Sequence, residues 1–83
     1  MLDLCILKLA MKSETNILEQ FGLTVKRLRV ELKLSQEELG QKAGMHRTYV
    51  GMVERAEKNL TLSNVEKLAN GLGISIADLF KEL

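Results

Sequence analysis

The sequence contains no proline and only one cysteine and one histidine among its 83 residues. Because Cys5 has no partner for an internal disulfide, the cytoplasm is the expected compartment. His46 has no cluster of Cys, His or Asp residues near it in the sequence, so neither a metal site nor general-base chemistry is expected. We therefore predict a protein that is not an enzyme and needs no cofactor.

An excess of either charge is also missing overall, since 12 Lys or Arg stand against 11 Asp or Glu and the formal net charge is only +1. Its distribution along the chain is uneven. Residues 24–58 carry eight Lys or Arg against five Asp or Glu, whereas residues 1–23 and 59–83 each have one more acidic than basic residue. A chain of this length forms one domain with a single modest core. The basic excess in residues 24–58 is where an attraction to phosphate is expected.

No long hydrophobic run is present either. The apolar segment 1–11 is far shorter than the roughly 18 residues of a membrane span, and it lacks the basic start and cleavage pattern of a signal peptide. Leu2, Leu4 and Ile6 alternate as in a strand, while Leu2, Ile6 and Leu9 fit a helix, so its structure stays open. We treat residues 1–15 as an N-terminal extension that packs on its own domain or on a second subunit, and residues 16–83 as the folded domain.

Helical patterns dominate the rest of the chain. Apolar residues recur every three or four positions from about residue 16 to residue 32, which predicts an amphipathic helix with a possible break near Gly22. Four further helix starts follow, each with a capping residue: Ser35, His46, Thr61 and Ser75. Gly73 is expected to end the fourth helix in the left-handed conformation. The sequence therefore predicts an all-α fold of five helices.

Residues 35–54 contain two short helix patterns that meet at Gly44, which is typical of a helix-turn-helix. Gly40, inside the first of these helices, suggests a close approach by the following helix. In the second helix, Val50 and Val53 are expected to face the core. The residues expected to face outward are Arg47, Thr48, Gly51 and Met52. This second helix has the polar first turn of a helix that enters a DNA groove.

Residues 24–80 resemble the Cro/phage-repressor (XRE-type) helix-turn-helix regulators, which have a compact five-helix, lambda-repressor-like DNA-binding domain. The matching motifs are Leu34-Ser35-Gln36-Glu37-Glu38-Leu39, Ala43-Gly44, Val53-Glu54-Arg55, Leu68-Ala69 and Leu72-Gly73-Ile74-Ser75. The runs His46-Arg47-Thr48-Tyr49-Val50, Glu54-Arg55 and Lys58-Asn59-Leu60-Thr61 are similar to the controller proteins of restriction–modification systems. Those proteins are small homodimers that bind palindromic operators upstream of their own genes.

The resemblance implies roles for individual side chains. Base reading falls to Arg47 and Thr48, with Tyr49 either at a base or phosphate or simply packed against the domain. Arginine suits guanine, and the threonine methyl suits the methyl group of thymine. The implied phosphate contacts are Gln36, Lys58 and Asn59. The chain departs from the family pattern at Ala56 and Glu57, where a carboxylate near phosphate would weaken binding unless it points away.

Two further expectations concern structure rather than DNA. The family pattern makes Arg29 and Glu54 an ion pair between the first and third helices. The last helix has an apolar face that little of the remaining chain can cover, and we expect it to form a two-fold dimer contact. That face consists of Ile76, Leu79, Phe80 and Leu83.

The sequence thus predicts a homodimeric regulator that binds a pseudo-palindromic operator in double-stranded DNA and regulates its own gene, with a contact to RNA polymerase where it activates. A phage-type repressor or an antitoxin is the alternative within DNA binding. An interaction module that docks a protein on the same scaffold is the alternative of another class. Salt separates the two classes, because DNA binding weakens steeply as salt rises and a hydrophobic protein contact does not.

Overall fold

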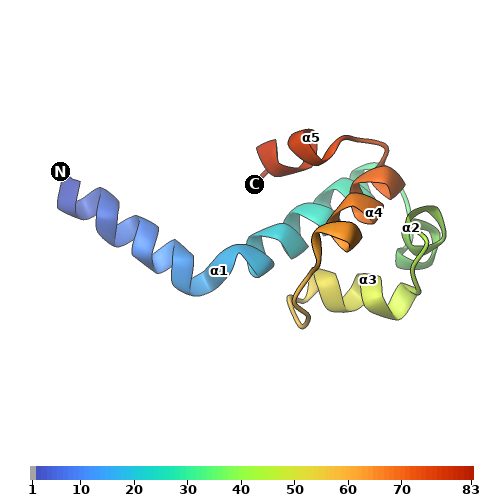
Figure 1. Cartoon of the computed structure of the whole chain (residues 1–83), viewed down its shortest axis with the longest axis horizontal. Coiled ribbons are helices and arrows are strands. Elements are labelled where there is room, and N and C mark those ends of the chain that lie inside the picture. Colours follow the sequence, from blue (N-terminus) through green and yellow to red (C-terminus); the bar gives the residue numbers. More distant parts are fainter. Residues whose placement is uncertain (1) are drawn as a thin grey trace.

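The computed structural model describes the backbone of residues 2–83 and the side chains from Asn16 onward. All regular secondary structure in this part of the chain is helical (Figure 1). The helices are α1 (Leu2–Glu31), α2 (Gln36–Ala43), α3 (Arg47–Glu54), α4 (Leu62–Leu72) and α5 (Ile76–Lys81). The predicted all-α fold of five helices is confirmed.

Helix α1 contains a break at Asn16, whose backbone has φ 61° and ψ 163°. The Asn16 side-chain oxygen accepts hydrogen bonds from the amides of Leu18 (2.8 Å) and Glu19 (3.2 Å), so it caps the second part of the helix. The amphipathic helix expected from about residue 16 therefore begins where the sequence indicated. The first part of α1 extends away from the other helices (Figure 1). The packing predicted for residues 1–15, Cys5 included, lies outside the side chains that the structure describes.

The break considered near Gly22 is absent, because Gly22 lies within the continuous part of α1. A methyl group added there would collide with the carbonyl oxygen of Val53 and come within 2.9 Å of that of Glu54. Gly22 thus lets α1 and α3 cross at close range. Gly40 serves a similar purpose, but its close neighbour is the turn before α3: a methyl group there would lie 2.5 Å from the carbonyl oxygen of Met45.

Each predicted capping residue begins its helix. Ser35 and Glu38 form a reciprocal capping box at α2, and His46 accepts from the amide of Thr48 at the start of α3. The side chains of Thr61 and Ser75 accept from the amides of Asn64 and Asp78 at the starts of α4 and α5. The left-handed residues Gly44 (φ 73°) and Gly73 (φ 77°) end α2 and α4.

The core is formed by apolar residues from all five helices. Its members are Phe21, Val25, Leu39, Ala43, Val50, Val53, Val65, Leu68, Ala69, Leu72 and Leu79. Leu79 is fully buried within the single chain, so its assignment to a dimer surface was wrong. The reason is the turn of α5, which directs Leu79 inward and leaves Phe80 at the edge, with its ring 6.3 Å from that of Phe21.

Among the residues that the structure describes, no helix is long and apolar enough to cross a membrane.

Candidate nucleic-acid interface

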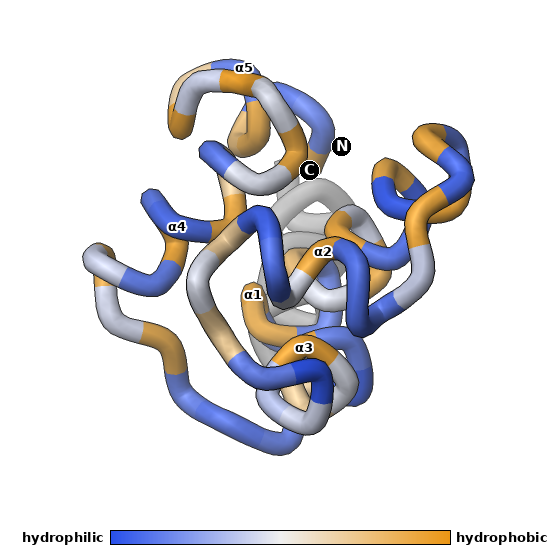
Figure 2. The backbone as a smooth tube through the Cα atoms, turned by 90° about the vertical axis from the view of Figure 1, so that its right-hand side faces the viewer, coloured by the Kyte–Doolittle hydropathy of each residue, from blue (hydrophilic) through white to orange (hydrophobic). Residues whose placement is uncertain are grey.

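Helices α2 and α3 form the helix-turn-helix, joined by the short turn from Gly44 to His46. Figure 2 views the end of the molecule where this turn lies, with α5 at the top, α4 at the left and α3 below. Val50 and Val53 bury the inner side of α3 in the core, as predicted. Helix α3 is therefore held with its opposite side toward solvent, which is the arrangement that a recognition helix needs.

A buried ion pair fixes the position of α3. Arg29 Nε donates to Glu54 Oε2 at 2.7 Å, and Arg29 Nη2 donates to Glu54 Oε1 at 3.1 Å. Arg29 also donates to the carbonyl oxygen of Leu34 (2.8 Å). The predicted pair is present, and it links the end of α1, the loop before α2 and the end of α3 at one point.

Gln36 joins the same network. Its Nε2 donates to Glu54 Oε1 at 3.0 Å, and the side chain is half-buried. The amide nitrogen expected to face a phosphate is thus used inside the free protein, while the Gln36 oxygen lies beside Gly51. Its phosphate role stays a prediction, and the structure adds a positioning role at the start of α2.

The first turn of α3 presents Arg47 and Thr48 to solvent. The Arg47 side chain is 65% exposed and forms an ion pair with the exposed Glu37 of α2, with 3.6 Å between Nη1 and Oε2. Such an exposed and loose pair holds a side chain weakly. Arg47 is therefore free to reach a base edge, as the sequence predicted for it.

Tyr49 lies one position further along α3 and is half-buried against the core. Its hydroxyl oxygen accepts a hydrogen bond of 2.9 Å from Nδ2 of Asn64 in α4. Since Asn64 is the donor, the tyrosine keeps its own proton to offer to another acceptor. Asn64 could not be found from the sequence, because nothing in the pattern of α4 pairs it with α3.

The outward surface of α3 differs from the sequence prediction at Gly51, which is buried rather than exposed. The covering group is the guanidinium of Arg55. A methyl group added at Gly51 would lie 3.0 Å from Arg55 Nη1 and 3.4 Å from Gln36 Oε1. Met52 is half-buried. Arg55 is therefore a further basic side chain of this surface, and its position directly after Glu54 in the family motif was the available signal.

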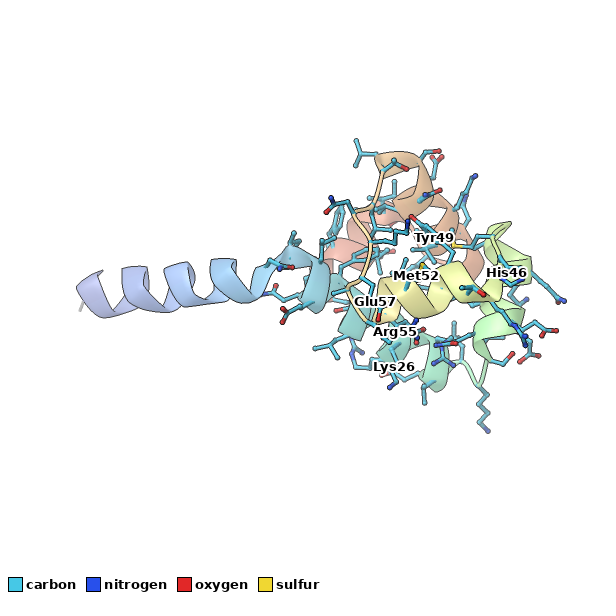
Figure 3. The ribbon with its side chains drawn as sticks, turned by 90° about the horizontal axis from the view of Figure 1, so that it is seen from below. Lys26, His46, Tyr49, Met52, Arg55 and Glu57 are labelled. Carbon is cyan, nitrogen blue, oxygen red and sulfur yellow. The ribbon has the colours of Figure 1, made fainter. Side chains whose placement is uncertain are left out.

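Figure 3 shows this surface, with His46, Tyr49, Met52 and Arg55 following one another along α3. Glu57 and Lys26 lie at the same end of α3 as Arg55. The loop from α3 to α4 continues with Lys58 and Asn59, which are both exposed. The polar side chains predicted from the sequence thus gather around α3 and its two flanking turns.

Glu57, where the chain departs from the family pattern, forms an ion pair with Arg55. Arg55 Nε donates to Glu57 Oε2 at 2.9 Å and Arg55 Nη2 to Glu57 Oε1 at 3.3 Å. The Arg55 guanidinium lowers the pKa of the Glu57 carboxyl through these hydrogen bonds. The carboxylate therefore stays ionised and points at an arginine of the same surface.

Within the part of the chain whose side chains are described, no group of three or more His, Cys, Asp or Glu residues could hold a metal ion. His46 instead accepts the amide of Thr48 through Nδ1 at 3.0 Å, as a helix cap.

The helix-turn-helix family model matches residues 25–79, which is well over half of the chain and runs from the last part of α1 into α5. The chain belongs to the helix-turn-helix family. Control protein C.MunI from a Mycoplasma species is 38% identical to this helix-turn-helix chain over 65 residues, which cover 77% of the chain and 88% of C.MunI. This relative places the chain among the controller proteins.

Solved structures agree with that placement. The restriction–modification controller protein C.AhdI from Aeromonas hydrophila is similar with a TM-score of 0.73 and 44% identity, over 76% of this chain and 91% of C.AhdI. C.Esp1396I bound to a 19 base pair DNA duplex is similar with a TM-score of 0.73 and 33% identity, over 77% of this chain and 85% of C.Esp1396I. The region shared with these controller proteins is the domain that carries α3.

Proposed function

We propose that this chain is a sequence-specific DNA-binding transcriptional regulator of the restriction–modification controller type. The observation that carries the proposal is the first turn of α3. It exposes Arg47 and Thr48 on a helix whose other side is locked by Val50, Val53 and the Arg29–Glu54 pair. A rigid helix with a polar, exposed first turn suits the major groove.

In the proposed complex, Arg47 donates two hydrogen bonds to a guanine and Thr48 packs its methyl group on a thymine. Tyr49, whose hydroxyl proton is left free by Asn64, donates to a base or a phosphate. Gln36, Lys58 and Asn59 contact the phosphate backbone on either side of α3. These backbone contacts set the register of the helix, and the base contacts set the sequence.

We propose a homodimer built on the outer edge of α5. Phe80 is 42% exposed and Leu83 is 40% exposed, while Ile76 is half-buried next to them. Leu79 is excluded because it belongs to the core. A two-fold axis at this edge would place two α3 helices on one face of the duplex, and half-sites about 34 Å apart would then form a pseudo-palindromic operator.

The proposed regulation works by occupancy, in the cytoplasm and without catalysis. A dimer bound over a promoter excludes RNA polymerase, and a dimer bound beside the promoter contacts the polymerase and recruits it. Autoregulation requires that the operator lies upstream of the gene for this chain.

The test is a titration of the purified protein into a labelled duplex from directly upstream of its own gene, with a scrambled duplex of equal length as the control. Both are measured at two salt concentrations. We expect tight, salt-sensitive binding to the upstream duplex alone. Equal binding to both duplexes would refute autoregulation. Absence of binding to either would refute the DNA-binding proposal and favour the interaction module.

A further inference from the structure

Arg55 and Glu57 are brought together by an unusual end of α3. The amide of Ala56 donates to the carbonyl oxygen of Val53 (3.0 Å), and the amide of Glu57 donates to that of Met52 (2.8 Å). Ala56 between them has φ 58°, in the left-handed region that favours glycine. This turn directs the Glu57 side chain back toward Arg55.

The contact between the two side chains is bidentate. Two nitrogens of Arg55 donate to the two carboxylate oxygens of Glu57, at 2.9 and 3.3 Å. A phosphate group presents two oxygens to an arginine in the same planar arrangement. Glu57 therefore occupies the donors of Arg55 in the way that a phosphate would.

The position of Arg55 is the one expected for a phosphate contact. Its guanidinium lies over Gly51 of α3, which the Gln36 oxygen at the first residue of α2 also approaches. Lys26 of α1 lies at the same end of α3 (Figure 3). Arg55 is thus on the side of the helix-turn-helix that would meet the DNA backbone, next to a residue already predicted to contact it.

The pair is poorly placed to stabilise the fold. The side chains of Arg55 and Glu57 are 56% and 51% exposed, and exposed ion pairs contribute little to folding because water and salt screen them. The buried pair of Arg29 and Glu54, by contrast, is 11% and 3% exposed. An exposed pair is easily exchanged for another partner, and a nearby phosphate would be such a partner.

We propose that Arg55 is a phosphate-contacting residue and that Glu57 competes with DNA for its guanidinium. The inference rests on the proposed DNA-binding function. On binding, Arg55 exchanges the carboxylate for a phosphate, and Glu57 turns to solvent. Because phosphate contacts carry no sequence information, this competition weakens binding to every duplex alike. The base contacts by Arg47 and Thr48 offset this loss of affinity only at the operator.

The experiment compares the full-length protein with three variants: Glu57→Gln, Arg55→Ala and the double variant. Affinity for the upstream and scrambled duplexes is measured over a range of salt, and circular dichroism checks that each variant is folded. We expect Glu57→Gln to tighten binding to both duplexes about two- to fivefold, the range of an exposed ion pair. Its salt slope should steepen by up to about 0.9, as for one more phosphate contact.

The double variant separates competition from a general charge effect. If Glu57 acts through Arg55, the gain from Glu57→Gln disappears when Arg55 is already Ala. A gain of the same size in both backgrounds would overturn the proposal, as would a wild-type affinity in Glu57→Gln. Glu66→Gln is the matched control, because it makes the same chemical change at an exposed residue of α4, outside both the helix-turn-helix and the proposed dimer edge. It should leave both affinities unchanged.

The wild-type measurement keeps the two proposals distinguishable. Wild-type protein that fails to bind either duplex refutes the proposed function and this inference with it. Wild-type protein that binds the upstream duplex, together with a Glu57→Gln variant that binds no more tightly, refutes only the role of Glu57.

Discussion

Arg29 and Glu54, 25 positions apart in the sequence, form a two-point ion pair in which the shorter bond is 2.7 Å and neither side chain is more than 11% exposed. Gln36 donates to the same carboxylate. The pair therefore joins three helices behind the surface proposed to meet DNA. Its position explains how α3, only 8 residues long, can be held rigidly.

Arg29→Met should destabilise the domain by about 3–5 kcal/mol, because it leaves the Glu54 carboxylate buried with Gln36 as its remaining partner. Urea unfolding followed by circular dichroism measures the change. Arg27→Met is the matched control, since Arg27 pairs with Glu31 and Glu82 at the exposed surface. An equal loss in both variants would contradict the importance assigned to the buried pair.

Arg47→Ala should weaken binding to the operator by about 1–3 kcal/mol and relax the sequence preference, because a two-point contact to guanine is lost. Binding to random DNA should change much less. Lys58→Ala is the contrasting variant. It should weaken operator and random DNA alike and flatten the salt slope by about 1. Specific binding that survives Arg47→Ala would show that α3 does not read the sequence.

Ala56→Gly should stabilise the domain by about 1 kcal/mol, since φ 58° strains a residue with a Cβ atom and does not strain glycine. The measurement is thermal or urea unfolding of the free protein. Ala77→Gly, at an exposed position inside α5, is the control and should destabilise by about 1 kcal/mol. Destabilisation by Ala56→Gly would mean that the left-handed turn is not present in solution.

The capping box of α2 should make the stability of the fold depend on pH in the acidic range. Hydrogen bonds from the Ser35 backbone and hydroxyl lower the pKa of the Glu38 carboxyl below its usual range. A lowered pKa in the folded state means that the ionised carboxylate stabilises the fold above the pKa of the unfolded chain. That contribution is lost as pH falls through the lowered folded value.

Thermal unfolding of wild type and Glu38→Gln across a pH series tests this dependence. The wild type should melt at the higher temperature near neutral pH, and the difference should shrink as the solution is acidified below the ordinary pKa of a glutamate. A difference that stays constant into strong acid would show that the charge of Glu38 plays no part.

Local features were predictable from the sequence because they depend on neighbours along the chain. Ser35, His46, Thr61 and Ser75 begin helices through hydrogen bonds to amides two or three residues ahead. Gly44 and Gly73 end helices for the same local reason, since glycine alone adopts φ near 75° without strain. The spacing of three residues between Val50 and Val53 likewise indicated which side of α3 is buried.

The errors arose where contacts between distant segments decide the outcome. Leu79 was expected on the dimer surface, but the packing of α5 against the core buries it completely. Gly51 was expected to be exposed, but Gln36 of α2 and Arg55, one helical turn further on, lie against it. Gly22 was suspected of breaking α1, whereas its missing side chain makes room for α3. The position of an apolar or small residue in the helical repeat is the same whether that residue is buried or exposed. The repeat alone therefore could not distinguish the two environments.

The sequence by itself determined the five helices, their caps and the helix-turn-helix, because capping, turn formation and amphipathic periodicity act over a few residues. Tertiary structure alone decided that Asn64 donates to Tyr49 and that Gln36 joins the Arg29–Glu54 pair. Those contacts depend on side-chain directions set by the crossing of whole helices. The physical reason is range: a hydrogen bond between helices requires that every helix of the core is already in place.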